Sequence, residues 1–454
     1  MRLLFVFLSL LHLNVWSQEG VSLVKLSAEM VNSNLNVLPT EDGGAWLVSR
    51  PGPLKQSKQA SLVRLDPSGK LISEFEVVAG SNNDLKGHLF IYAHVSANQL
   101  NLITSRYIKS EKRMSVWKWS VGESGLLADG REIASFQSDS ESGFQCATSP
   151  SKNYLAIFAY VTGDFVLLDK DLNSQFNHRS ALKKTARLSS LVVSDNGSVA
   201  ATSAETVGGG KVKCMLHCWT ESDSWEQDLT APDGYIDDQS LYACFKSNGN
   251  PVAVSFGMSL NTSLLKSMSY TELNLASSDA VRKLYQLDKS LEMLNHKTCR
   301  LYSLKNNSVA IVGEGNDGAI LVVDSALEFS YCPFNFGYID GKGVVSAQDY
   351  VIAGGDVICV GWVGAKDIDL LKSGSLQTTK PDKSDKIHLY VVSLNGCQKM
   401  NISVSSVPVE SHLFVTDYNV SENKIVTSNN RIYMTLGFVS KSKPGGVLSF
   451  KLDQ

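Results

Sequence analysis

Short runs in which apolar and polar residues alternate recur along the whole chain, and small polar residues separate the two runs of each pair. The clearest example is SLVVSDNGSVAATSAE, residues 190–205, in which two alternating runs flank Asp195, Asn196 and Gly197. Alternation with a period of two is typical of β-strands, and Asn-Gly between two such runs indicates a tight turn. Because Gly and Asn tolerate positive φ best, we expect positive φ at the centre of these turns. The pattern therefore predicts repeated β-hairpins.

Eight such hairpins can be aligned, at intervals of 44 to 74 residues. Their turns fall at Asp42, Asn98, Lys152, Asn196, Asn248, Asn306, Gly355 and Asn429. A third alternating run follows each hairpin and a fourth follows most of them, most clearly at residues 69–78. Four antiparallel strands that recur about every 50 residues are typical of a β-propeller, in which each unit forms one blade.

The two ends of the chain each carry an incomplete unit. The last unit stops at Gln454 after its third strand, whereas residues 21–30 (VSLVKLSAEM) form a strand-like run without a hairpin partner. If residues 21–30 pair in the last blade, both incomplete units are explained and no open arc of sheets remains. We therefore predict an all-β fold, with residues 18–454 forming one propeller of eight four-stranded blades. Seven blades is the alternative, if one hairpin belongs to an insertion.

The first 17 residues have the pattern of a secretory signal peptide. Arg2 is followed by an apolar run over residues 3–13, and Val15 and Ser17 stand at the −3 and −1 positions before Gln18. The run is too short to span a bilayer, which takes about 20 apolar residues. These residues predict export to the periplasm or the outside of the cell, with an uncleaved anchor as the alternative.

The composition and the cysteine pattern argue against nucleic-acid binding and against a metal site. A formal net charge of −3 and a pI near 6.3 give no basic footprint for nucleic acid. The eight cysteines mostly lie inside strand-like runs, which favours buried thiols or disulfides between blades. Cys214 and Cys218 are four residues apart in such a run, or about 13 Å in an extended strand, so they cannot share a metal ion. We expect no metal and no cofactor.

The units DPSGKLISEF (residues 66–75) and GGDVICVGWVG (354–364) resemble those of exported bacterial β-propellers. On these residues the chain resembles the broad β-propeller superfamily. The motifs are generic, and the Trp-Asp and Asp-box signatures of better-known propellers are missing. The resemblance thus implies a fold and no particular activity.

No catalytic motif of the G-x-S-x-G, H-E-x-x-H or C-x-x-C type occurs, and we expect His217 to be a packed residue rather than a base. The longer connections, such as residues 364–386, all fall on one face of the expected ring. Aromatic rings and carboxylates near these connections suit sugar stacking and polar recognition. The candidate ligand-binding residues are Tyr235, Asp237, Asp238, Phe334, Phe336, Tyr338, Asp340 and Trp362.

These patterns predict an exported, monomeric binding or scaffold module that recognises a protein or a glycan through its long-loop face. The alternative is a hydrolase or lyase acting on saccharides, with Asp237, Asp238 and Asp340 converging at the central channel. A component of a lattice or an adhesion structure is a third interpretation.

Overall fold

The computed structural model describes the strands of the chain and most of the turns between them. The described residues are 21–26, 34–50, 59–78, 86–96, 98–122, 125–179, 182, 186–207, 211–230, 236–258, 265–287, 299–313, 320–331, 347–353, 356–364, 387–395, 399–409, 425–428, 431–436 and 445–451. For the described residues after 331, only the strands and their backbone pairing are considered.

The strands form four-stranded antiparallel sheets in which neighbours in sequence are neighbours in space. The first three sheets are β2 (Asn34–Pro39), β3 (Ala45–Arg50), β4 (Gln59–Leu65), β5 (Leu71–Val78); β6 (Leu89–Ser96), β7 (Gln99–Ile108), β8 (Arg113–Val121), β9 (Leu127–Gln137); and β10 (Phe144–Thr148), β11 (Tyr154–Ala159), β12 (Asp164–Asp169), β13 (Ser174–Arg179). The next two are β14 (Arg187–Val193), β15 (Val199–Val207), β16 (Lys211–Trp219), β17 (Ser224–Asp228); and β18 (Ile236–Phe245), β19 (Pro251–Met258), β20 (Leu265–Leu273), β21 (Ala280–Gln286). Then follow β22 (Cys299–Ser303), β23 (Val309–Gly313), β24 (Ile320–Val323), β25 (Phe329–Tyr331); and β26 (Ala347–Ala353), β27 (Asp356–Gly364), β28 (Ile387–Asn395), β29 (Lys399–Val409).

The remaining sheet combines the two ends of the described chain. It contains β30 (Ile425–Ser428), β31 (Arg431–Leu436) and β32 (Gly445–Lys451), and β1 (Val21–Leu26) pairs antiparallel with β32. The register runs from Val21 opposite Phe450 to Leu26 opposite Gly445. The N-terminal run thus pairs where the incomplete units predicted, while residues 27–30 of the expected strand lie outside the described residues.

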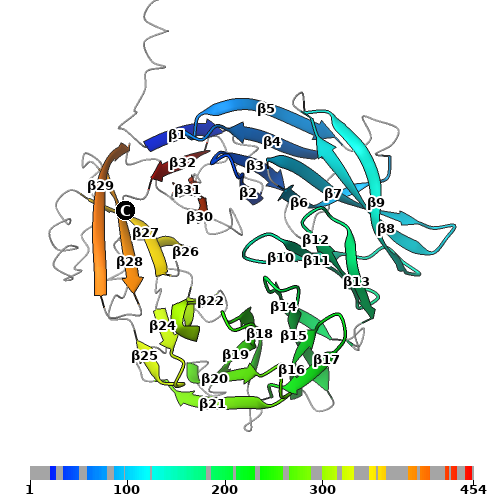
Figure 1. Ribbon diagram of the computed structural model, residues 1–454, viewed down its shortest axis with the longest axis vertical. Helices are drawn as coiled ribbons and strands as arrows, with labels where there is room; N and C mark the ends of the chain where they lie inside the picture. Colours follow the sequence, from blue (N-terminus) through cyan, green and yellow to red (C-terminus); the bar gives the residue numbers. More distant parts are fainter. Residues whose placement is uncertain are drawn as a thin grey trace, which may run out of the picture.

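The sheets stand around a common centre, with the first strand of each hairpin inside; in the sheet that joins the chain ends, β30 is therefore the inner strand and β1 the outer one (Figure 1). The chain is a β-propeller. Its secondary structure besides strands is a single 3-10 turn, Lys305–Asn307, among the described residues.

The middle strands of a blade are buried on both faces, and this explains why many of them read as continuous apolar runs. β11 has the sequence YLAIFA and is buried from Leu155 to Ala159, whereas the outer strand β21 is largely exposed. The buried residues form clusters that each join two consecutive sheets. One unites Leu155, Ile157 and Val166 with Ile103 and Val116 of the preceding sheet. The ring is therefore held by apolar contact between neighbouring blades.

Antiparallel order places the first-to-second and third-to-fourth turns of every sheet at one end of the blades. We call this side the short-turn face, and the opposite side, with the longer connections, the long-loop face. Of the predicted hairpin turns, those at Gly355 and Asn429 lie outside the described residues. Positive φ falls at the centres of the described turns, on Gly43, Gly197 and Gly249 beside Asp42, Asn196 and Asn248, and on Lys152 and Asn306 themselves. The amide of each glycine donates to the carbonyl three residues earlier, as in a type I turn that is followed by a left-handed residue.

One blade also contains a buried polar network. Thr104 Oγ1 accepts a hydrogen bond of 2.9 Å from Trp119 Nε1 and lies 2.9 Å from His88 Nδ1. All three side chains are buried, and burial lowers the pKa of His88 to about 4, so the imidazole is neutral near pH 7. The network fixes β8 against β7 and the segment that precedes β6.

Candidate functional site

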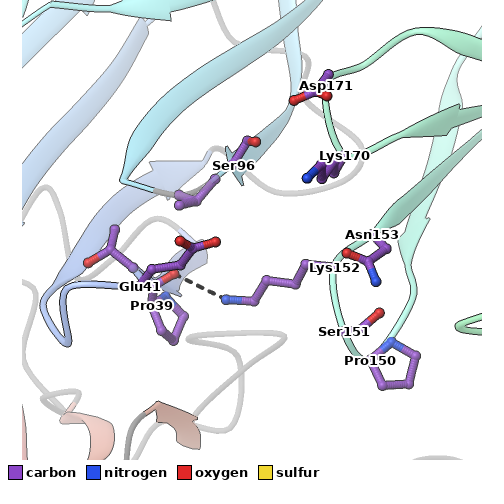
Figure 2. Close-up of a pocket in the computed structure, with 11 residues that line it drawn as sticks. Pro39, Glu41, Ser96, Pro150, Ser151, Lys152, Asn153, Lys170 and Asp171 are labelled. Atoms are coloured by element: carbon purple, nitrogen blue, oxygen red, sulfur yellow. Dashed lines mark hydrogen bonds between the residues drawn. The ribbon is translucent and has the colours of Figure 1, made fainter.

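A pocket of about 440 Å³ opens on the short-turn face where three consecutive blades meet. It is lined by Pro39, Thr40, Glu41, Val95, Ser96, Pro150, Ser151, Lys152, Asn153, Lys170 and Asp171. These residues come from the first hairpin turns of three sheets and from the turn between β12 and β13 (Figure 2). The pocket exists because three turns of similar shape meet at the inner ends of their blades.

Lys152 crosses this pocket from one blade to another. Its Nζ donates a hydrogen bond of 3.1 Å to the backbone carbonyl of Pro39, two blades earlier in the ring (Figure 2). The residue is half-buried, and this burial lowers the pKa of its amine. The same pocket is also lined by carboxylates, Glu41 from the β2–β3 turn and Asp171 from the β12–β13 turn (Figure 2).

Lys152 also occupies an unusual backbone position. Its φ is 60°, and its amide donates to the Ser149 carbonyl at 2.9 Å. Gly43, Gly197 and Gly249 make the same bond at the same place in their hairpins. A lysine therefore stands where three other hairpin turns use glycine, while the β22–β23 turn has Asn306 and Asn307 with positive φ.

The turn between β12 and β13 presents Lys170 and Asp171 to the pocket. Asp169 Oδ1 accepts from the amides of Asp171 and Asn173, both at 2.9 Å. Residues 169–173 (DKDLN) therefore form a tight turn. Arg131, on β9 of the preceding blade, donates a hydrogen bond of 3.3 Å to the Asp171 carbonyl and so links this turn to its neighbouring blade.

His94 lies buried close to the pocket and has an incompletely satisfied ring. Its Nε2 has no hydrogen-bond partner among the described residues. Burial lowers its pKa to about 4, opposed by a hydrogen bond to the Lys170 backbone and supported by the positive charges of Lys152 and Lys118. The imidazole is therefore neutral, and it adds no positive charge to this region.

A second hollow of about 500 Å³ continues from the first along the same face. Both share Pro150, and the second is lined by turn residues of the next blades: Ser194, Asp195, Asn196, Phe245, Lys246, Ser247, Asn248, Gly249 and Ser303. Ser151 bridges the turns, because its amide and hydroxyl both donate to Asp195 Oδ1, at 2.8 and 2.6 Å. Together the hollows expose hydroxyl and amide groups from several turns, with a mainly polar surface in the first hollow and a mainly apolar one in the second.

The charges of the second hollow are largely internal pairs. Lys246 Nζ lies 2.8 Å from Glu272 Oε2, and Asn250 donates to the other carboxylate oxygen at 3.1 Å. Burial raises the pKa of Glu272, but the hydrogen bonds from Lys246 and Asn250 outweigh it and the net shift is downward. Lys246 is thus paired with a carboxylate inside the hollow.

Ser203, His217 and Glu226 form a chain of contacts with the order of a hydrolase triad. Ser203 Oγ lies 2.9 Å from His217 Nε2, and His217 Nδ1 lies 3.3 Å from Glu226 Oε1. Sequence reasoning missed the arrangement because the three residues come from β15, β16 and β17. Ser203 and His217 are only 3% and 4% exposed, and the imidazole stacks on Trp219 at 5.7 Å. A substrate has no access to this serine, so the network packs the blade, as expected for His217.

The described cysteines are thiols within the blades. Cys146, Cys214, Cys218, Cys244 and Cys299 form no disulfide, and burial raises the pKa of Cys218 and Cys244 to about 12. No cluster of three potential metal ligands occurs in the described part of the chain. No helix there is long and apolar enough to cross a membrane.

Most of the candidate residues on the long-loop face fall outside the described residues. This holds for Tyr235, Phe334, Phe336, Tyr338 and Asp340. Asp237 and Asp238 lie in β18 and not in a loop, where the pairing register shifts between Ile236 and Leu241. Trp362 lies in β27, opposite Leu389. The site residues on the long-loop face thus remain predictions, whereas the two hollows described above lie on the opposite face.

No protein-family model matches the sequence, and no curated protein matches it. Among solved structures, the chain is similar to Sqt1 from Chaetomium thermophilum, with 13% identity over 95% of this chain and 100% of that chain and a TM-score of 0.48. It is also similar to PorZ, a surface component of the type-IX secretion system of Porphyromonas gingivalis, with 13% identity, coverage of 92% and 61%, and a TM-score of 0.40. For puromycin hydrolase the values are 12% identity, 90% and 60% coverage, and 0.37. These likenesses concern the fold alone.

Proposed function

We propose that the protein is an eight-bladed propeller, closed by β1 and acting as a binding module for a protein or a glycan. The closure rests on the pairing of β1 with β32 in the sheet that holds the last strands of the chain. Shared closure makes the ring rigid, since opening it requires the loss of a whole strand pairing. Deletion of residues 21–26 should therefore lower the thermal unfolding midpoint of the ring by several degrees; an unchanged midpoint would contradict the closure.

The binding role is carried by the two joined hollows of the short-turn face. They lie on hairpin turns and contain hydroxyl and amide groups suited to hydrogen bonds with a peptide backbone or with sugar hydroxyls, and the second hollow adds apolar surface. Rigid turns cost little entropy on binding. The short-turn face is therefore the first candidate surface, and the long-loop residues Tyr235, Phe334, Phe336, Tyr338 and Trp362 form the second.

Glycan and peptide arrays probed with the purified chain test this role. We expect retained ligands whose binding falls in Asn248→Ala, which changes the short-turn face, and is kept in Trp362→Ala. The reverse result would place the ligand on the long-loop face, and the absence of any retained ligand would count against a binding module.

Export and a monomeric state complete the proposal. Residues 1–17 supply the signal-peptide pattern, and a mature chain should begin at Gln18. N-terminal sequencing of the secreted protein and light scattering after gel filtration would check both points.

A saccharide hydrolase or lyase is the second candidate function. Asp237 and Asp238 are neighbours in β18, and β18 is the innermost strand of its sheet (Figure 1). With Asp340 they supply carboxylates of the type such enzymes use. Release of reducing ends or unsaturated products from polysaccharides, lost in Asp238→Asn, would favour the enzyme over the binding module.

A further inference from the structure

We propose that the second hollow of the short-turn face binds one neutral sugar ring, with the apolar face of the sugar on Phe245 and two neighbouring hydroxyls on Asp195 and Asn196. This inference rests on the proposed binding function. It narrows the ligand to a carbohydrate and the binding surface to this hollow.

The apolar surface of the hollow centres on one aromatic ring. Phe245 and Pro150 are the apolar side chains among the described lining residues, and the others are polar or glycine. Phe245 is half-buried and packs against the apolar cluster between the β14–β17 and β18–β21 sheets, so the ring is fixed while part of it lines the hollow. The negative face of an aromatic ring attracts C–H groups, which cover one face of a pyranose. A volume of about 500 Å³ lies in the usual range of small-molecule pockets.

Asp195 supplies a fixed hydrogen-bond acceptor in the same hollow. Its Oδ1 is occupied, because it accepts from the amide and the hydroxyl of Ser151 at 2.8 and 2.6 Å. These two bonds hold the carboxylate in place, and in the described part of the chain Oδ2 makes no hydrogen bond. Asp195 is exposed, so Oδ2 can accept from a ligand hydroxyl, and the negative charge strengthens such a bond.

Asn196 supplies a donor on the next residue. Its Oδ1 accepts from the hydroxyl of Ser194 and from the amide and hydroxyl of Ser198, which holds the amide group in one orientation. Nδ2 faces the turn of the next blade, because a Cβ on Gly249 would lie 3.4 Å from it. Within the described residues Nδ2 has no acceptor of its own. An acceptor and a donor on adjacent residues match two neighbouring sugar hydroxyls, since a hydroxyl can either donate or accept.

The charges around the hollow favour a neutral ligand over an acidic one. Among the described lining residues, Asp195 and Lys246 carry a charge. The Lys246 ammonium pairs with the Glu272 carboxylate at 2.8 Å and is not available to a ligand acid. The Asp195 carboxylate remains, and it would repel the carboxylate of a uronic acid.

A peptide backbone also carries donors and acceptors, but it usually pairs with the free backbone groups of a strand edge. The lining offers few such groups. The amides of Ser194, Lys246 and Gly249 each donate at 2.9 Å to a carbonyl of their own turn. The hollow thus presents side chains and a ring instead of a row of backbone groups, which favours a sugar over a peptide.

NMR titration at pH 7 tests the proposal with defined probes. The neutral probes are the methyl glycosides of glucose, galactose and mannose. The acidic probes are the methyl glycosides of glucuronate and galacturonate, and the peptide probe is a capped trialanine.

Two variants remove one binding group each. Asp195→Asn keeps an oxygen for Ser151 and replaces the free acceptor by a donor, whereas Phe245→Leu keeps an apolar side chain and removes the ring. Asp66→Asn is the matched control. Asp66 Oδ1 likewise accepts from the amide and hydroxyl of one serine, Ser68, both at 2.7 Å, and Asp66 lines neither hollow.

We expect the wild-type protein and Asp66→Asn to bind at least one neutral glycoside with equal affinity. Asp195→Asn should bind it about 10- to 100-fold more weakly, the range for one charged hydrogen bond. Phe245→Leu should bind it about 3- to 10-fold more weakly, as expected for the loss of one ring contact. Each uronic acid should bind no better than its neutral counterpart, and the peptide should not bind.

Three results would overturn the sugar site: no neutral glycoside binds, Asp195→Asn and Phe245→Leu both bind as tightly as the wild type, or a uronic acid binds better than its neutral counterpart. Array ligands that bind the wild type and both variants equally would overturn this inference and leave the binding module standing. An empty array together with no glycoside binding would remove both.

Discussion

Replacing Thr104 with valine should destabilise the protein far more than the loss of one hydroxyl group suggests. Thr104 is fully buried, and its Oγ1 contacts both Trp119 Nε1 and His88 Nδ1 at 2.9 Å. The indole N–H can only donate, and valine offers no acceptor. The change therefore strands two buried polar atoms and removes no bulk.

The magnitude follows from these two atoms. A buried polar group left without a partner costs about 1–3 kcal/mol. Two such groups cost about 2–6 kcal/mol, and the added methyl group returns roughly 0.8 kcal/mol of apolar burial. We expect the free energy of unfolding to fall by about 1–5 kcal/mol, a large part of the total for a typical domain.

Urea denaturation followed by far-UV circular dichroism measures this change through the midpoint and the slope. Thr202→Val is the matched control. Thr202 is equally buried on the second strand of its blade, but it makes one long donation, 3.3 Å to the Leu241 carbonyl. That variant should lose about 1 kcal/mol or less. If Thr104→Val stays within about 0.5 kcal/mol of the wild type, the network contributes no stability and the reasoning is refuted.

Three further changes test other parts of the fold. Gly130→Ala would place a Cβ 2.4 Å from the Trp119 ring, so we expect a loss of about 1–3 kcal/mol in thermal unfolding; an unchanged midpoint would show that the blade yields freely. Glu272→Gln should destabilise the chain at pH 7 and much less at pH 3. The pKa of Glu272 is lower in the folded protein than in the unfolded chain, so the carboxylate stabilises the fold above the unfolded pKa and loses this effect as the pH falls through the folded pKa. Equal losses of stability at both pH values would argue against this reasoning. His94 has a pKa of about 4 in the folded protein against 6.5 in the unfolded chain, so the unfolded chain binds more protons between these two values. The free energy of unfolding should therefore fall by up to about 3 kcal/mol as the pH is lowered from 6.5 toward 4. His94→Asn should flatten this part of the stability profile, and a slope as steep as that of the wild type would contradict the role of His94.

The sequence alone determined the repeated unit of this protein. Alternating runs and Gly- or Asn-bearing turns have a local cause, because side chains alternate between the two faces of a strand and tight turns need positive φ. For the same reason the sequence identified the hairpins around Asn196 and Asn248, in which positive φ falls on the following Gly197 and Gly249. The pairing of residues 21–26 with the last strand was also predictable, since both ends carried incomplete units.

Only the tertiary structure decided which residues meet. Lys152 and Pro39 are 113 residues apart and touch because their turns face the same centre of the ring. Ser203, His217 and Glu226 align across three strands through pairing register, which no local motif records. Loop length favoured the long-loop face, whereas the described hollows lie among the short turns, because a hollow depends on how neighbouring blades pack and not on how long a connection is.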